Sequence, residues 1–137
     1  MLQYEKLKKE EIKEASELAA RAYFDYIYIT IFFPGLKERQ RGLARFLAIN
    51  RKGNFKGSHM LTARLDGRMV AEAALEPPGY RQPSVLKFIL SGYLKMYFLT
   101  NWKHLHAFLA KDEEASTPCH DYQKNNPDVW YLSMIEV

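Results

Sequence analysis

The stretch His59-Met-Leu-Thr-Ala-Arg-Leu-Asp-Gly-Arg-Met-Val-Ala-Glu-Ala-Ala-Leu-Glu76 decides the fold. Apolar and polar residues alternate over residues 59–65 and alternate again from Met69 to Glu76. Asp66-Gly67 lies between the two runs, and this dipeptide accepts the positive φ angles that a two-residue turn requires. The stretch therefore predicts an antiparallel β-hairpin. Pro77-Pro78 ends it, because proline cannot continue a ladder of backbone hydrogen bonds.

Upstream of the hairpin, the sequence predicts one short strand and two helices. Tyr4–Leu7 is the strand candidate. From Glu10 to Tyr26 apolar residues recur at spacings of three and four, which is typical of an amphipathic helix. Pro34-Gly35 ends this segment, and helical spacing resumes from Leu36 to Asn50. The glycines and the asparagine within Gly53–Gly57 predict a loop before the hairpin.

Downstream of the hairpin, the pattern predicts two more helices and a final strand. The helices extend over Ser84–Leu99 and Asn101–Lys111, and a long polar loop, interrupted by two prolines, follows at Asp112–Asp128. The strand is Val129–Val137. The predicted order is β-α-α-β-β-α-α-β, an α/β fold of the α+β kind with a mixed sheet. Because 137 residues suffice for one core and are too few for two, we expect a single domain over 1–137.

The formal net charge of +4 and the pI near 9.1 are compatible with an anionic partner. The basic residues are scattered, and those between Lys37 and Lys56, Arg39 and Arg51 among them, form no dense block. This distribution is typical of solvated helix faces. Binding of nucleic acid, which needs a continuous basic stripe, therefore ranks below the other functions.

Cysteine content and hydropathy indicate a cytoplasmic protein without a membrane partner. Cys119 is the one cysteine and cannot form an internal disulfide, and the start MLQYEKLKK lacks the apolar stretch of a secretory signal. The most apolar run, Val85–Leu99, has 15 residues and contains two lysines. A bilayer span needs about 20 apolar residues, so this run predicts a buried or groove-lining helix.

The final strand reads Trp130-Tyr-Leu-Ser-Met-Ile-Glu-Val137. Together with the preceding order of elements, it resembles the first four strands of GNAT N-acetyltransferases. Many bacterial members have a W/Y-Y-L-x-x-[IL]-x-V strand before a Q/R-x-x-G-x-G/A loop that opens a helix, and this loop does not occur here. The resemblance covers the whole chain as a pattern of elements, but only Trp130–Val137 is motif-like. It implies a GNAT-like acyl-CoA N-acyltransferase fold, truncated after the fourth strand, whose C-terminal cofactor-binding segment is absent.

The resemblance implies transfer of an acetyl group from acetyl-CoA to an amine, with no metal. In the family, the pantetheine arm of the cofactor pairs with the fourth strand, here through the main chain of Met134, Ile135, Glu136 and Val137. An amine that is protonated at neutral pH must lose a proton before it attacks. A carboxylate on the fourth strand often accepts that proton, which makes Glu136 the first candidate for the catalytic base and Glu76 the second. Without the phosphate-binding loop, we expect the chain alone to be weak or inactive.

Acceptor recognition in the family comes from the helices that follow the first strand and from the segment between the third and fourth strands. Aromatic residues in these segments are the candidates for a substrate-binding groove; they are Tyr26, Tyr28, Phe33, Tyr93 and Tyr97. The alternative for each of them is a place in the core. The sequence leaves the acceptor amine itself open.

A second interpretation belongs to a different class of function. The chain could be a non-enzymatic module that associates through its exposed last strand and its aromatic helices. This interpretation predicts a homodimer in which two Val129–Val137 strands pair, because an unpaired strand edge favours association.

Overall fold

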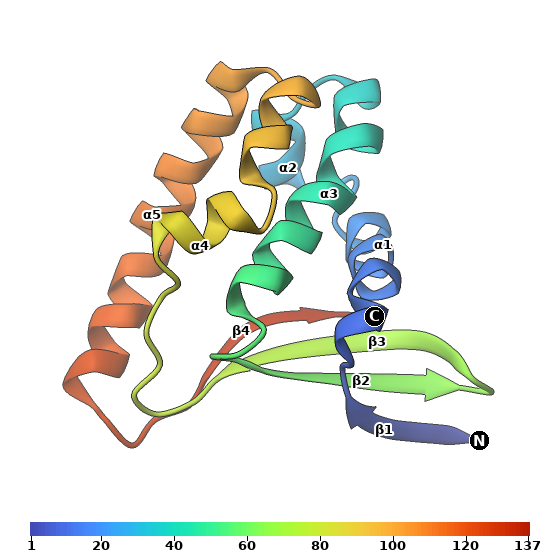
Figure 1. Ribbon diagram of the computed structural model, residues 1–137, viewed down its shortest axis with the longest axis vertical. Coiled ribbons are helices and arrows are strands. Elements are labelled where there is room, and N and C mark those ends of the chain that lie inside the picture. The colour runs from blue at the N-terminus through green and yellow to red at the C-terminus, as the bar shows by residue number, and fades with distance from the viewer.

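Four antiparallel strands form one sheet in the order β1-β2-β3-β4, and the helices gather on one of its faces (Figure 1). The computed structural model describes every residue from Met1 to Val137. The strands are β1 (Leu2–Lys6), β2 (His59–Leu65), β3 (Arg68–Glu76) and β4 (Tyr131–Glu136). The expected combination of helices with one sheet is confirmed. The sheet is wholly antiparallel, however, and not mixed.

The predicted hairpin is confirmed with its predicted turn. Asp66 has φ of 50° and Gly67 has φ of 81°, so both turn residues adopt the left-handed conformation that such a turn requires. Leu65 and Arg68 face each other directly across the turn. The hairpin supplies the two central strands of the sheet.

The segment between β1 and β2 forms helices that pack above the sheet. They are the 3₁₀ turn η1 (Lys9–Glu11), α1 (Ile12–Ala22), α2 (Ile27–Phe32) and α3 (Leu36–Asn54). The prediction of a loop at Gly53 and Asn54 was wrong, because α3 continues through both. The Asn54 amide donates to the Asn50 carbonyl at 3.0 Å. Gly53 is buried against the ring of Phe88, and this packing offsets the weak helix propensity of glycine.

The segment between β3 and β4 departs most from expectation. The single helix predicted over Ser84–Leu99 is two pieces, α4 (Val85–Leu90) and the 3₁₀ helix η2 (Tyr93–Phe98), because Gly92 between them has φ of 106°. The loop predicted over Asp112–Asp128 was also wrong. Helix α5 (Trp102–Asn125) runs through Pro118. The buried Gln123 amide donates to the Glu76 and Pro77 carbonyls at 3.3 and 3.1 Å, which holds the end of α5 against the sheet.

Two apolar clusters make up the core. One lies among the helices around Phe108, whose ring packs against those of Phe33 and Phe46. The other lies between α1 and the sheet and includes Ile12 and Met60. Met134 of β4 packs against both clusters, so the last strand is tied to the whole core.

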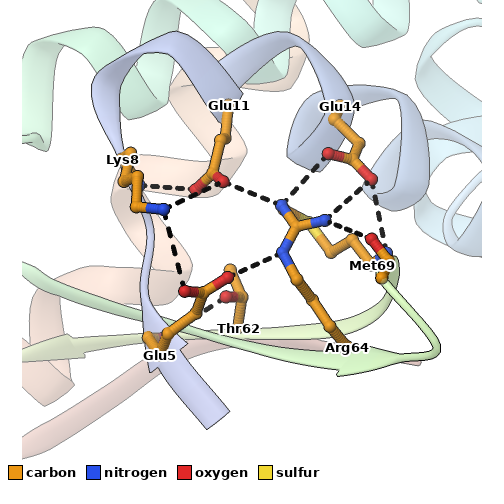
Figure 2. A network of polar contacts seen from close by, with 8 residues as sticks. Glu5, Lys8, Glu11, Glu14, Thr62, Arg64 and Met69 are labelled. Atoms are coloured by element: carbon orange, nitrogen blue, oxygen red, sulfur yellow. Dashed lines mark hydrogen bonds and ion pairs between the residues drawn. The ribbon is translucent and has the colours of Figure 1, made fainter. Parts of the chain in front are cut away.

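A polar network joins the start of α1 to the hairpin (Figure 2). The Arg64 guanidinium on β2 lies 2.8 Å from the carboxylate of Glu5, 3.0 Å from that of Glu11 and 3.2 Å from that of Glu14. The Arg64 contact holds the pKa of the Glu14 carboxyl below its usual value. One cation therefore fixes three carboxylates and the orientation of α1 over the sheet.

In this fold, no helix has both the length and the apolar character needed to cross a membrane.

Candidate functional site

Strand β4 is an edge strand with an irregularity in its middle. Ala74 of β3 faces Met134 and the next residue, Leu75, faces Leu132, so Ser133 is an extra residue and forms a β-bulge. The Ser133 hydroxyl donates to the Ala74 carbonyl at 3.1 Å. Beyond β4 no further strand pairs with the sheet. A bulge bends a strand and redirects its side chains, and such bulges are frequent beside active sites.

The side chain of Glu136 lies on the helix-covered face of the sheet, in a buried ionic cluster with Arg51 and Glu72. The three residues are 3%, 1% and 2% exposed. Arg51 of α3 donates to both carboxylate oxygens of Glu72, at 3.0 Å from Nε and 2.7 Å from Nη2. Its Nη2 also contacts the Glu136 carboxylate directly. Arg51 is thus a buried anchor of the sheet, which corrects the prediction that it lies on a solvated helix face.

In this cluster one cation, Arg51, faces two carboxylates, so the cluster would carry a net charge of −1 if both carboxylates were ionised. Burial raises the pKa of Glu136 to about 8, although Arg51 acts in the opposite direction, and the neighbouring Glu72 adds to the rise. The Oε2 atom of Glu136 has no hydrogen-bond partner. Near neutral pH the Glu136 carboxyl therefore holds a proton in a large share of molecules. The side chain faces Arg51 inside the protein and is closed off from an amine bound outside.

Helix α1 also contacts this strand. The Tyr23 hydroxyl donates to the Ile135 carbonyl at 2.9 Å. Burial raises the pKa of Tyr23 to about 12, so the phenol keeps its proton at neutral pH. Met134 to Glu136 of β4, and Val137 directly after it, are the residues predicted to bind the cofactor through their main chain. They lie on an edge strand that Tyr23 and Arg51 hold in place from the side of the helices.

Glu76, the second predicted base, lies at the other end of the β3–β4 pair and faces His120 of α5. The Glu76 Oε2 atom is 3.4 Å from the His120 Nε2 atom and makes no hydrogen bond. The Gln82 amide nitrogen is 2.9 Å from His120 Nδ1. An amide nitrogen only donates, so Nδ1 accepts and the ring proton resides on Nε2, facing Glu76.

Aromatic side chains surround this carboxylate–imidazole pair. The Tyr80 ring stacks on His120 with the ring centroids 6.5 Å apart, and the Tyr131 ring meets it edge-on at 5.9 Å. Burial raises the pKa of Glu76, and His120 opposes that rise. The His120 side chain remains 24% exposed, so solvent and small molecules have access to it. The pair is an acid–base group that is open on one side, beside the beginning of β4.

Of this pair, only Glu76 was predicted from sequence to act in catalysis. Glu76 is named there as a carboxylate at the end of a strand, whereas His120 falls in the segment predicted as a loop. With α5 helical to Asn125, His120 lies on a fixed surface over the end of the sheet. Helical spacing across Pro118 was the signal that could have revealed this position.

The five aromatic residues predicted to bind substrate do not form one groove. Phe33 is buried and packs on Phe108, and Tyr28 packs on the same ring. Tyr93 packs against the helical core as well. Tyr26 and Tyr97 are exposed, and the Tyr97 hydroxyl lies 2.9 Å from His106 Nε2. Three of the five therefore serve packing, which was the alternative considered for each.

One open depression lies away from these groups, between α1 and α3, with a volume of about 510 Å³. Its rim carries Lys9, Lys13, Arg45 and Lys52, but also Glu10 and Glu17. None of the residues predicted to act in catalysis or cofactor binding lines it. No group of three or more His, Cys, Asp or Glu side chains is placed to hold a metal ion.

Comparison with known proteins gives no match, either to any family model or to any curated protein sequence.

Proposed function

We propose that this chain is the N-terminal part of a GNAT-type domain that transfers the acetyl group of acetyl-CoA to an amine. The observation that carries the proposal is β4, an edge strand with a bulge at Ser133 at the end of four antiparallel strands in sequential order. In the family that Trp130–Val137 resembles, the fourth strand carries a bulge and receives the pantetheine arm, and β4 is the matching strand here.

The unpaired edge of β4 suits an extended ligand that contains amide groups. An edge strand offers backbone N–H and C=O groups, and an extended chain pairs with them as an added strand would. The pantetheine arm has such amides, and in this proposal it pairs with the main chain of Met134, Ile135, Glu136 and Val137. Acetyl-CoA supplies an activated acetyl group when bound. The residues of the chain hold the cofactor in position and accept the proton of the amine.

In this proposal Glu76 accepts the proton of the incoming ammonium. Its Oε2 atom is buried without a hydrogen-bond partner, 3.4 Å from Nε2 of His120, and the His120 ring is the side of the pair that solvent reaches. Glu136, the first choice from sequence, has a buried side chain held by Arg51. We therefore favour Glu76 as the base and give Glu136 a role in holding β4, with its main chain at the cofactor edge.

Residues 1–137 contain no glycine-rich loop of the kind that binds a pyrophosphate through backbone N–H groups. The proposal therefore expects weak binding of acetyl-CoA by these residues. A cytoplasmic location belongs to the same proposal, since Cys119 is a free thiol and disulfides are rare in that compartment.

The test combines thermal stability with acetyl transfer. Acetyl-CoA and CoA should raise the melting temperature of the chain in a dose-dependent way, whereas ATP should not. Ligand at a hundredfold excess over Kd adds about 2.7 kcal/mol to the free energy of unfolding.

The rate of acetyl transfer to a panel of primary amines should fall by a factor of about 10² to 10⁴ in Glu76→Gln, because general-base catalysis contributes that much. Glu17→Gln, at an exposed position of α1, is the matched control. Because these residues alone are expected to transfer weakly or not at all, the thermal shift is decisive, and its absence with both acetyl-CoA and CoA would overturn the proposal.

A protein-interaction module is the second candidate, and the uncovered face of the sheet favours it. Large apolar side chains on that face are exposed; they are Leu2, Tyr4, Leu61, Leu65 and Ile135. Exposed apolar patches and unpaired strand edges both favour association. Pairing of two β4 edges would then give a homodimer, which light scattering over a range of concentrations would detect.

A further inference from the structure

An apolar stripe extends along the segment that connects β3 to β4. Every fourth residue from 86 to 102 is a large apolar residue, and all five are exposed. Their exposed fractions are 64% for Leu86, 78% for Leu90, 56% for Leu94, 90% for Phe98 and 57% for Trp102. Single exposed apolar residues are common on proteins, but five large ones within residues 86–102, spread over two short helices and the start of α5, are a concentration that needs an explanation.

The stripe faces away from the core because other residues of the same helices face toward it. Phe88 of α4 packs over Gly53 of α3, and Met96 of η2 is fully buried. Figure 1 shows α4 and the segment that follows it between α3 and α5. The helices thus bury Phe88 and Met96 against the core and leave the five residues of the stripe exposed to solvent.

The charge around the stripe is of one sign. From Pro77 to Lys111 there is no Asp or Glu. Lys87, Lys95 and Lys103 each directly follow a residue of the stripe. The carboxylate nearest to the start of α5 is Glu38 of α3, and it is engaged, since it accepts from the Asn101 N–H at 2.7 Å and lies 3.1 Å from His104.

From these observations we propose that the apolar stripe binds the surface of an anionic lipid bilayer. Apolar side chains flanked by lysines, with Phe and Trp at one end, are typical of segments that lie in the plane of a membrane interface. The apolar side chains would enter the boundary between headgroups and acyl chains. The three lysines would contact lipid phosphates, and the absence of carboxylates removes the repulsion that would otherwise oppose this contact.

This proposal revises the expectation that the protein has no membrane partner. That expectation rests on the length of the run Val85–Leu99, which is too short to cross a bilayer. A stripe that lies along the surface needs no such length, because only one side of each helix contacts lipid. Membrane binding of this kind is independent of the acetyltransferase proposal and would place catalysis near a membrane surface if both hold.

The experiment measures binding to vesicles. The W130F variant leaves Trp102 as the single tryptophan, and its fluorescence reports the environment of the stripe. With vesicles of phosphatidylglycerol and phosphatidylcholine, we expect a blue shift and co-sedimentation, both weakened when salt is raised from 0.1 to 0.5 M because screening shortens the reach of charge. Vesicles of phosphatidylcholine alone should bind at least tenfold more weakly.

Three double variants of this protein separate the contributions. L90S/F98S removes apolar surface and K87E/K95E reverses charge, and each should weaken binding to anionic vesicles at least tenfold. I27S/I31S, which changes exposed apolar residues of α2, should leave binding unchanged. Circular dichroism checks that every variant is folded. The proposal is overturned if anionic vesicles do not bind, if L90S/F98S binds as well as the parent, or if L90S/F98S abolishes self-association instead.

Discussion

Among single residues, Arg51 makes the buried ion pairs that join a helix to two strands of the sheet. It lies on α3, yet its guanidinium reaches β3 through Glu72 and β4 through Glu136. An isolated charge is expensive to bury, and one cation cannot neutralise two carboxylates. A proton on Glu136 resolves the imbalance, since burial raises the pKa of that carboxyl to about 8. The cluster therefore couples the attachment of β4 to pH.

The first prediction concerns this coupled proton. The pKa of Glu136 is about 8 in the folded chain against an ordinary value of 4.5, so between these values the folded chain holds a proton that the unfolded chain has lost. Stability contributed by that proton is complete at low pH and is lost as pH rises through 8. We expect the melting temperature of the wild type to fall between pH 5 and pH 9 more steeply than that of E136Q, which has no such proton.

Thermal unfolding of both chains over this pH range is the measurement. All other ionisable groups are present in both proteins, so their effects cancel in the difference between the two melting temperatures. The difference, wild type minus E136Q, should decrease as pH rises. A difference that is constant with pH would show that Glu136 is ionised throughout.

The sequence showed which single residues have the chemistry for a site, but it did not show which residues contact one another. Glu76 and Glu136 are identified as carboxylates at strand ends, and both prove to be buried beside basic groups. Arg51 is 21 residues from Glu72 and 85 from Glu136 along the chain, so no local pattern reveals that they meet. Contacts of this range depend on tertiary packing.

At the scale of elements, predictions succeed where the signal is local. Asp66-Gly67 specifies its turn through the φ angles of two residues, and the hairpin follows. Pro118 led to the wrong prediction of a loop, because proline weakens a helix locally whereas the contacts that stabilise α5 involve residues distant in the sequence. Gln123 anchors the end of α5 on carbonyls of Glu76 and Pro77, which lie 47 and 46 residues away. Gly92 ends a helix because its φ of 106° is open to glycine and costly for other residues.

The second prediction concerns the hairpin turn. Gly67 has φ of 81°, and a Cβ there would meet no atom within 4 Å, so Gly67→Ala introduces backbone strain without a clash. We expect a loss of about 1–2 kcal/mol in the free energy of unfolding, the cost of the left-handed conformation for a residue with a side chain. Chemical denaturation gives this quantity directly.

Gly57→Ala is the matched control for the turn. The φ angle of Gly57 lies outside the left-handed range, and a Cβ would touch Tyr80 at an ordinary 3.5 Å. This change should be neutral or slightly stabilising, because alanine restricts the unfolded chain more than glycine does. Equal losses in the two variants would mean that the conformation of the turn is not what limits substitution at Gly67.

At the scale of the whole molecule, the main feature is a layer of helices that covers only one face of the sheet. All helices lie on one face of the sheet (Figure 1). The opposite face exposes Leu61 and Ile135, which a globular protein normally covers. The sheet also has two unpaired edges, β1 and β4, of which β4 carries the bulge and the predicted cofactor residues. In the interaction-module proposal, these exposed surfaces are the ones through which the chain would associate.

The last prediction compares the two edges. If molecules associate by pairing β4 strands, the amides on the unpaired side of β4 gain hydrogen bonds, and their hydrogen exchange slows as protein concentration rises. The amides on the unpaired side of β1 should not change, and they serve as the control within the same molecule. Association through the apolar face would raise the mass measured by light scattering while leaving both edges unprotected, because stacked sheets exchange no backbone hydrogen bonds. Slower exchange in β4 alone would therefore show that a segment of extended backbone can add to this edge, which is also the property that binding of pantetheine requires.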